Sequence, residues 1–436
     1  MTRFHVVGAG LAGLAAALRL AEAGADIVLH EAGRQAGGRC RSYFDATLGC
    51  RIDNGNHLLM EGNGAAMAYL DAIGARGTLI GPEETRYDFM DVANGQRWVL
   101  RPNRGRLPWW IWRQDRRIPG SHAIDYLRAA RLIAARTNSA VTDVLDRRTP
   151  LYRRLWQPLA VAALNTEPEA GSAQLLGQIL RETFGRGGAA CRPLVPHEGL
   201  SESLVDPALA RLKTLGAEIR LGSLLRAIED DGTSATALVF DGERVELGPQ
   251  DTLVLAVTAP VAARLMPEIT VPNEFRAIVN AHYRIQAPPG SPPFIGVIRG
   301  MAEWVFRKNE VLSVTVSAAD RMVDRPAEEL APLLWRDVAR AYDLPQNPMP
   351  RWQIVKERRA TFAATPAQLA RRPGTVTRFG NLVLAGDWTD TGLPATIEGA
   401  IRSGFAAASA ALSRASVTKG LSPAPHDAMV APVSLA

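Results

Sequence analysis

The hydrophobic and polar positions of this chain form their clearest pattern at the N-terminus. Residues 4–7 (FHVV) are a short apolar run, as expected of a buried strand. From Leu11 onwards, apolar residues recur with the spacing of one helix face, which predicts an amphipathic helix. Gly24 interrupts this helix, and residues 26–31 form a second apolar run. The pattern therefore predicts a strand, a helix and a second strand in succession.

Apolar runs, alternation and helical spacing also divide the rest of the chain into predicted strands and helices. Residues 251–257 and 382–385 are apolar runs that we expect to return to the first sheet as buried strands. Alternation over residues 85–101 predicts a β-hairpin. Residues 121–185 are rich in helical spacing, whereas residues 273–370 alternate strands and helices and predict an antiparallel sheet. With 436 residues, the chain is long enough for two domains.

The turn after the first strand contains three glycines in a G-x-G-x-x-G arrangement. Gly8 allows a tight turn, Gly10 lets a pyrophosphate approach the backbone, and Gly13 lets the helix pack closely on the strand. The free N–H groups at the start of the helix would face the phosphates. Glu31 ends the second strand, where a carboxylate can accept hydrogen bonds from ribose hydroxyls. These features predict dinucleotide binding; a purely structural glycine turn would leave Glu31 unexplained.

Composition argues against several classes of function. The 50 basic and 44 acidic side chains give a formal charge of +6, and no basic run is interleaved with aromatic residues, so we expect no nucleic-acid partner. The seven histidines lack ligand spacing, so no metal is expected. The three cysteines form no framework, which fits a reducing cytosol. No signal peptide is evident, and no apolar run reaches the ~18 residues of a membrane-spanning helix. We therefore expect a cytoplasmic protein that can lie on the inner face of the cytoplasmic membrane.

One segment bears on that membrane question. Three tryptophans, Trp109, Trp110 and Trp112, are followed closely by three arginines, Arg113, Arg116 and Arg117. Amphipathic aromatic rings beside arginines are typical of a surface that lies in a membrane interface. The alternative is a loop that packs over a substrate cavity. The sequence leaves both interpretations open.

Several longer segments resemble one known family. Gly37-Gly38-Arg39 extends the glycine motif in the manner of FAD enzymes that are similar to amine oxidases and phytoene desaturases. Over nearly its whole length the chain resembles the squalene-associated FAD-dependent desaturase family, whose members include hydroxysqualene dehydroxylases. The segments that carry the resemblance are VVGAGLAGLAAA, IDNGNHLL, LNTEPEAGSAQLL, WVFRK, RRATFAATPAQLARRPG and LVLAGDWTDTGLPATIEGAIRSG. Asn56 departs from the glutamine that is more frequent at its position.

The resemblance implies a fold and a division into domains. It implies an α/β protein, with a Rossmann-like FAD-binding domain of the GR2 flavoprotein type and an inserted α+β substrate domain. The FAD-binding domain would comprise residues 1–75, 195–265 and 375–414, the substrate domain residues 76–194 and 266–374, and a flexible tail residues 415–436.

The resemblance also implies which residues contact FAD. Arg39 offers a planar fork of donors to the pyrophosphate and ribityl chain, Leu225 would lie near the adenine, and Asp387 would bind ribityl hydroxyls. Thr396 and Ile397 open a helix whose positive N-terminus would face the flavin N1–C2 edge. The full set is Gly8, Gly10, Gly13, Glu31, Gly38, Arg39, Gly55, Asn56, Leu225, Gly386, Asp387, Thr396 and Ile397.

His57 is the catalytic candidate. It follows Gly55 and Asn56 in the segment that runs beside the flavin ring in the resembling families, where the small Gly55 allows close approach. His57 would then hydrogen-bond near the flavin or donate a proton. The alternative is a histidine that only anchors the loop.

The reaction that the resemblance implies is the reductive dehydroxylation of hydroxysqualene to squalene, a step toward hopanoids and other triterpenoids. Its partners would be an isoprenoid lipid substrate and an unidentified electron donor. Three alternatives stay open: a carotenoid-type desaturase or isomerase, a flavin amine oxidase, and a non-catalytic lipid carrier stabilised by FAD. An amine oxidase would want an aromatic pair facing the flavin, for which only Trp388 is visible. That tryptophan would either line the substrate site or pack in the core.

Overall fold

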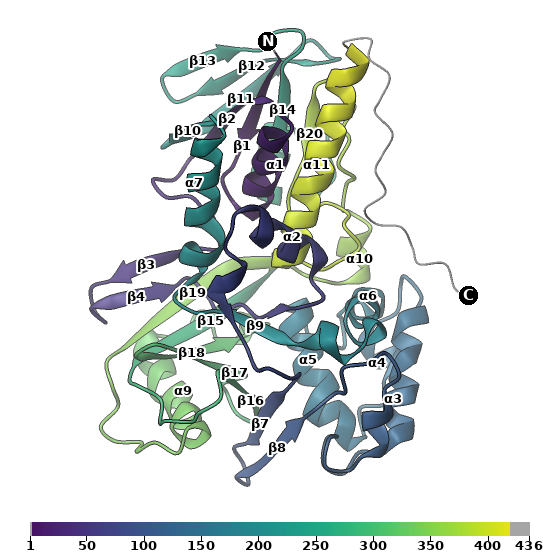
Figure 1. Ribbon diagram of the computed structural model, residues 1–436, viewed down its shortest axis with the longest axis vertical. Coiled ribbons are helices and arrows are strands. Elements are labelled where there is room, and N and C mark those ends of the chain that lie inside the picture. Colours follow the sequence, from purple (N-terminus) through teal and green to yellow (C-terminus); the bar gives the residue numbers. More distant parts are fainter. Residues whose placement is uncertain (1, 419–436) are drawn as a thin grey trace.

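The strand–helix–strand unit predicted at the start of the chain is confirmed. A computed structural model of the protein describes residues 2–418. In it, β1 (Arg3–Val7) leads into α1 (Leu11–Glu22), and the chain returns through β2 (Asp26–Glu31). Both strands are almost wholly buried, as their apolar runs require. Figure 1 shows that this unit lies in the upper of two lobes.

The upper lobe is built on a parallel five-stranded sheet. Its order is β10-β2-β1-β14-β20, and each strand runs parallel to its neighbours. The later strands are β10 (Glu218–Leu221), β14 (Thr252–Leu255) and β20 (Leu382–Leu384). An order in which the first strand is central and the third and fifth are at the edges defines a Rossmann-like sheet. The predicted α/β fold class is confirmed.

Alternating residues of the central strands face two layers. On one face, Val6, Val254 and Val383 join the apolar cluster of α1, α2 (Gly64–Ala72), α7 (Asp206–Thr214) and α11 (Ile397–Thr418). On the other face, the neighbouring residues pack against α8 (Ala259–Leu265) and a small sheet of β11 (Leu225–Asp230), β12 (Ala235–Phe240) and β13 (Glu243–Glu246).

The lower lobe is built on a mixed seven-stranded sheet of order β19-β15-β18-β17-β16-β7-β8. The antiparallel arrangement expected of residues 273–370 is confirmed among their own strands. The predicted hairpin is also present, but it joins this sheet through a parallel pairing of β7 with β16. The strands are β7 (Tyr87–Asp91), β8 (Gln96–Leu100), β15 (Phe275–Arg284), β16 (Phe294–Ile298), β17 (Trp304–Lys308), β18 (Val311–Val316) and β19 (Trp352–Phe362).

Helices cover both faces of this sheet (Figure 1). The amphipathic helix α9 (Ala327–Ala341) packs on one face. The other face packs against residues of the helix-rich part of the chain, which contains α3 (Ala123–Ala129), α4 (Val141–Val144), α5 (Gln157–Leu164) and α6 (Ala173–Glu182). Short pieces complete the chain: β3 (Ser42–Asp45), β4 (Cys50–Asp53), β5 (Leu59–Met60), β6 (Leu79–Ile80), β9 (Pro193–Pro196) and α10 (Pro366–Leu369).

The expected boundary of the C-terminal tail is wrong at its start. The last helix does not end at residue 414 but continues to Thr418. The remainder of the predicted flexible tail, residues 419–436, lies outside the described residues.

Candidate active site

The predicted cofactor residues gather at the carboxyl ends of the parallel strands. Gly8 follows β1, Glu31 ends β2, and Gly386 comes shortly after β20. In open parallel sheets the crevice at this edge is where ligands bind. Residues that are far apart in the sequence are therefore brought to one edge of the upper lobe.

The glycine turn has the shape that a bound pyrophosphate requires. Gly8 has a φ of +106°, and a Cβ placed on it would lie 2.5 Å from the carbonyl oxygen of Ala256. A Cβ on Gly13 would lie 1.8 Å from the carbonyl oxygen of Gly8, so the helix can approach the strand only without a side chain. A Cβ on Gly10 would meet no protein atom within 4 Å. No side chain caps α1 at Gly10, so its N-terminus is left open toward this space, which suits an anion.

Glu31 is fixed beside the turn. Its two carboxylate oxygens accept hydrogen bonds from the backbone N–H groups of Ala9 and Gly33, each at 2.8 Å. Each oxygen keeps a further lone pair, so a ribose hydroxyl can still donate to it. The strand that begins at Leu225 is close by, because the Ser223 N–H donates to the carbonyl oxygen of Glu31. The Leu225 side chain itself is buried in the core.

The Gly37-Gly38-Arg39 segment lies directly against the glycine turn. The Gly37 N–H donates to the carbonyl oxygen of Ala9 at 2.8 Å, and a Cβ on Gly38 would lie 3.5 Å from the Gly10 Cα. Arg39 donates to Asp387 at 2.7 Å and also to the carbonyl oxygen of Ala360. The side chain of Arg39 nevertheless keeps 37% of its surface accessible, so it lines an open space rather than filling the core. The two residues predicted to bind the ribityl chain are thus in contact.

The structure decides between the two interpretations of Trp388. Its indole N–H donates to the carbonyl oxygen of Val257 at 2.8 Å, and the side chain is buried. The ring also explains the preceding residue, because a Cβ on Gly386 would lie 2.3 Å from the indole nitrogen. Trp388 therefore packs in the core and supports the turn that carries Asp387.

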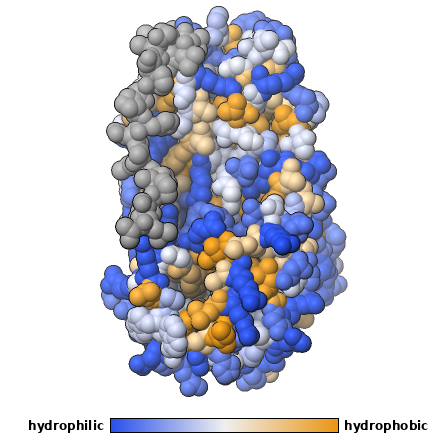
Figure 2. All heavy atoms as spheres, turned by 90° about the vertical axis from the view of Figure 1, so that its right-hand side faces the viewer, coloured by the Kyte–Doolittle hydropathy of each residue, from blue (hydrophilic) through white to orange (hydrophobic). Residues whose placement is uncertain are grey.

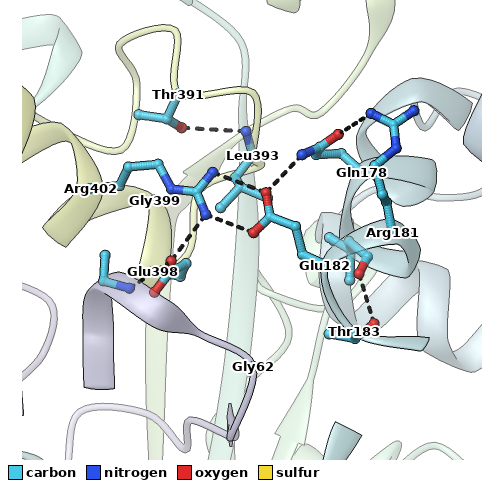
Figure 3. A network of polar contacts seen from close by, with 12 residues as sticks. Gly62, Gln178, Arg181, Glu182, Thr183, Thr391, Leu393, Glu398, Gly399 and Arg402 are labelled. Carbon is cyan, nitrogen blue, oxygen red and sulfur yellow. Dashed lines mark hydrogen bonds and ion pairs between the residues drawn. The ribbon is translucent and has the colours of Figure 1, made fainter. Parts of the chain in front are cut away.

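The start of α11 is held in place from three sides. Thr396 caps the helix by accepting from the Gly399 N–H at 3.0 Å, and Ile397 is its first residue. Glu398 accepts from the N–H groups of Ala65 and Ala66 at the start of α2. Arg402 bridges Glu398 to Glu182 of α6, as Figure 3 shows. The helix N-terminus predicted to face the flavin is thus tied to both lobes.

The segment that contains Gly55, Asn56 and His57 is anchored to the lower sheet. Asp53 forms a buried ion pair with Lys308 of β17. Burial alone would raise the pKa of Asp53, but Lys308 and hydrogen bonds from the Leu200 N–H and Ser42 outweigh it and lower the pKa. A Cβ on Gly55 would lie 3.2 Å from the Asn280 amide nitrogen. The backbone at Gly55 therefore lies close to the face of β15.

Two further residues that the sequence did not single out complete this anchor. The side chain of Asn280 in β15 donates to the carbonyl oxygen of Asn54 at 3.3 Å. The Asn56 amide donates to the Thr315 hydroxyl of β18 at 3.0 Å. The only signal in the sequence was that Asn280 and Thr315 are polar residues flanked on both sides by apolar ones within predicted strands.

The environment of His57 limits what it can do. Burial lowers the pKa of its ring to about 4, with Lys308 and Arg39 acting in the same direction and Asp53 opposing them. The ring is therefore neutral near pH 7 and carries no ready proton for an acid role. Among residues 2–418, no group of three or more histidine, cysteine or acidic side chains is placed to hold a metal ion.

A Rossmann-like sheet, a glycine turn open to a pyrophosphate and an acidic residue at the end of the second strand define a dinucleotide-binding protein. Residues 11–412 match the model of the flavin containing amine oxidoreductase family, and the chain belongs to this family. It is an FAD-dependent oxidoreductase.

Individual relatives agree over almost the full length. The chain is 52% identical to a hydroxysqualene dehydroxylase of Rhodopseudomonas palustris, over 93% of this chain and 97% of the relative. It is 47% identical to a hydroxysqualene dehydroxylase of Sinorhizobium fredii, over 94% of this chain and 98% of the relative. Among solved structures it is similar in fold to a redesigned putrescine oxidase, with a TM-score of 0.69 at 16% identity, over 94% of this chain and 99% of that one.

Proposed function

We propose that this protein reductively removes the allylic hydroxyl group of hydroxysqualene and releases squalene. The observation that carries the proposal is the high identity, over nearly the whole chain, to hydroxysqualene dehydroxylases. The reaction balances as one alcohol, one proton and one hydride giving one hydrocarbon and one water. Loss of the hydroxyl as water leaves an allylic cation, whose charge is delocalised over the double bond.

FAD, when bound and reduced, supplies the hydride. The chain's own residues would hold it at the edge of the parallel sheet. Gly8, Gly10 and Gly13 would leave room for the pyrophosphate, and Glu31 would accept from the adenosine ribose. Gly38 and Arg39, with Gly386 and Asp387, would line the pyrophosphate and ribityl path, and Leu225 would lie near the adenine. Gly55 and Asn56 would run beside the flavin ring, with Thr396 and Ile397 at its N1–C2 edge.

His57 would then contribute as a neutral ring. Its pKa of about 4 means that few molecules carry a charged imidazolium near pH 7. The ring N–H can still donate a hydrogen bond near the flavin. We therefore propose a positioning role for His57, and the proton for the departing hydroxyl would come from elsewhere.

One experiment separates this reaction from its alternatives. The purified holoenzyme, with its FAD reduced by light in the absence of oxygen, is mixed with hydroxysqualene for a single turnover. We expect one squalene per flavin reoxidised, measured by mass spectrometry and flavin absorbance. Reduction of oxidised flavin by a carotenoid precursor would instead support a desaturase, and flavin that never responds to any lipid would support a carrier. An amine oxidase is disfavoured because Trp388 is committed to the core.

We also propose that the protein collects its lipid at a membrane surface. No helix among residues 2–418 is long and apolar enough to cross a membrane. The docking surface we propose consists of Leu107, Trp109 and Trp112 with Ile124 and Leu127 of α3, all of which are exposed. This corrects the predicted set, because Trp110 is buried against Tyr126.

Charge supports the same surface. Residues 101–136 contain nine arginines and two aspartates, a net charge of 9 − 2 = +7, whereas the whole chain carries +6. The rest of the molecule is therefore close to neutral, and its positive charge is concentrated around the exposed tryptophans. Such a surface attracts anionic lipid headgroups while its apolar side chains enter the interface. Figure 2 views the molecule from the right-hand side of Figure 1, where α3 and α6 lie in the lower lobe. Apolar side chains gather on the lower half of this face.

A further inference from the structure

Two buried polar atoms beside the flavin-facing segment lack hydrogen-bond partners within the described residues. They are the side-chain oxygen of Asn56 and the indole nitrogen of Trp304. Both side chains are only 9% exposed. A buried donor or acceptor that loses its water partners without a replacement costs about 1–3 kcal/mol. Unsatisfied groups of this kind call for an explanation, and a ligand that completes them is one.

The orientation of the Asn56 amide is fixed by its neighbours. The Asn280 side-chain nitrogen donates to the carbonyl oxygen of Asn54, so the oxygen of that amide is left to accept from Thr315 at 2.8 Å. Because the Thr315 hydroxyl proton is used there, its oxygen must accept from Asn56. The nitrogen of Asn56 is therefore committed to Thr315, and its oxygen is the free end.

Trp304 lies next to these hydrogen-bonded side chains of Asn280, Thr315 and Asn56. It is the first residue of β17, and its register partner on β18 is Thr315. A Cβ on Gly296 of β16 would lie 3.2 Å from the Cζ3 atom of the indole, so the benzene edge of the ring lies over β16. The indole N–H is on the opposite edge of the ring. It therefore points away from β16, on the side of the strand where Thr315 and Asn56 lie.

The surface around Trp304 is apolar and aromatic. Its ring centroid lies 5.7 Å from that of Phe89 and 6.1 Å from that of Phe294. Phe306 and Tyr87 extend this row of rings through Phe294. The row lies on the sheet face that packs against the helical part. The face of an aromatic ring attracts positive charge, so these surroundings suit a hydrocarbon substrate that becomes an allylic cation during the reaction.

We propose that Trp304 and Asn56 form the subsite that binds the hydroxyl group of the substrate. A hydroxyl oxygen accepts from the indole N–H of Trp304, and the hydroxyl proton is donated to the free oxygen of Asn56. An alcohol satisfies both unpartnered atoms at once, whereas squalene satisfies neither. The inference rests on the proposed dehydroxylation and adds how the enzyme tells its substrate from its product, because a site built for a hydroxyl discriminates against an analogue that lacks it.

The test compares the binding of hydroxysqualene and of squalene to the oxidised holoenzyme, read from the perturbation of flavin absorbance. Trp304→Phe keeps an aromatic ring but removes the N–H. We expect it to reduce the preference for hydroxysqualene over squalene by about tenfold, the value of one buried hydrogen bond. The matched control is Trp98→Phe, because Trp98 is a buried tryptophan of the same apolar cluster with an unpartnered N–H, but on β8. We expect Trp98→Phe to keep the wild-type preference.

Thr315→Val provides a second, nearly isosteric variant. It removes the bond that orients Asn56, so the preference for hydroxysqualene should fall. Because Thr315 also anchors the segment predicted to run beside the flavin, flavin content is measured as well and the preference is compared per bound flavin. An unchanged preference in both Trp304→Phe and Thr315→Val would overturn the subsite, as would an equal loss of affinity for the two lipids. A wild-type enzyme that converts no hydroxysqualene would contradict the proposed function instead. Conversion with unaltered discrimination in the variants would contradict only the subsite.

Discussion

At Gly10, a substitution is expected to disturb cofactor binding without disturbing the protein fold. A Cβ at this position would meet no protein atom within 4 Å, so we expect Gly10→Val to fold. It would, however, occupy the space in which we expect the pyrophosphate. We predict that purified Gly10→Val contains less than about a tenth of the wild-type flavin, since a clash worth 1.4 kcal/mol already lowers affinity tenfold.

The matched control for Gly10→Val is Gly77→Val, at an exposed glycine that also has open space around it. Flavin content is measured by absorbance after acid precipitation, and folding by circular dichroism. Gly77→Val should retain its flavin. A Gly10→Val protein with a full complement of FAD would contradict the placement of the cofactor at this turn.

Glu303 should make the stability of the protein depend on pH. Burial raises the pKa of its carboxyl group to about 7, while its side chain accepts from the Ser317 N–H. The folded state therefore holds the proton more tightly than the unfolded state, and this contribution to stability is lost as the pH rises from about 4.5 to about 7. Glu303→Gln has no such loss. We predict that the variant gains stability relative to wild type between pH 5 and pH 8.

The gain from Glu303→Gln has an upper bound of about 3 kcal/mol, reduced by the solvent that reaches the partly exposed group. Thermal unfolding of the holoenzyme at several pH values measures it. Glu328→Gln, at an exposed carboxylate, serves as the control and should show no such trend. A difference between Glu303→Gln and wild type that is the same at pH 5 and pH 8 would refute the prediction.

Individual site residues could be predicted only where their constraint is local. The roles of Gly8, Gly10 and Gly13 follow from one turn, and the structure gives each the space expected of it. The ion pair between Asp53 and Lys308 joins residues 255 positions apart. Hydrophobic periodicity marks Lys308 as part of a strand but does not reveal which loop lies over it. The same limit hid the contacts of Asn56.

At the scale of elements, two of the segments that carry the family resemblance form one joint. Asn165 ends α5 in a left-handed conformation with a φ of 47°. Its side chain accepts from the Ala318 N–H at 2.7 Å and donates to Thr361 of β19 at 2.9 Å. The next residue, Thr166, accepts from the Ala364 N–H. The helical part is thereby fastened to the end of β19 and to the turn after β18.

We predict that Asn165→Ala destabilises the protein by about 3 kcal/mol, because it strains the backbone and leaves buried partners unsatisfied. Asn309→Ala is the control: its φ of 45° imposes the same backbone strain, but the side chain is exposed. Denaturant unfolding of both variants isolates the contribution of the buried bonds. Equal losses in the two variants would mean that the bonds of Asn165 contribute nothing beyond conformation.

Element types were more predictable than their partners. The alternation of residues 85–101 predicted a hairpin and the apolar run of residues 251–257 a buried strand, and both are present. The parallel pairing of β7 with β16 was not predicted, because the apolar pattern of a strand is the same whichever neighbour it has. The mixed sheet forms only when the two parts of the chain that build the lower lobe, which contain residues 87–100 and 275–362, pack together.

At the scale of the whole molecule, the division into an FAD-binding domain and a substrate domain was inferred from the resemblance rather than from periodicity. Arg402 joins α11 to Glu182 of α6, so the helix whose N-terminus is predicted to face the flavin is held by the helical part of the lower lobe (Figure 3). The uneven distribution of charge was not apparent from the total. A net charge of +6 is modest, yet residues 101–136 alone carry +7.

The concentration of positive charge in residues 101–136 predicts that this segment binds the surface of an anionic bilayer. Leu107 and Trp112 are 81% and 62% exposed, and Trp109 is held beneath the Arg116 guanidinium at 5.0 Å. Apolar side chains surrounded by arginines should bind vesicles that contain phosphatidylglycerol, and binding should weaken as salt screens the charges.

Replacing Leu107, Trp109 and Trp112 with serine should lower co-sedimentation with these vesicles more than tenfold. A loss of about 1.4 kcal/mol in binding free energy suffices for that factor, and each side chain would contribute at least as much on burial. Phe44→Ser with Val376→Ser removes two exposed apolar side chains elsewhere and should leave binding unchanged. Conversion of detergent-solubilised hydroxysqualene by the triple variant should stay at the wild-type rate, because these side chains face outward. Undiminished sedimentation of the triple variant would leave the tryptophan segment without a membrane role.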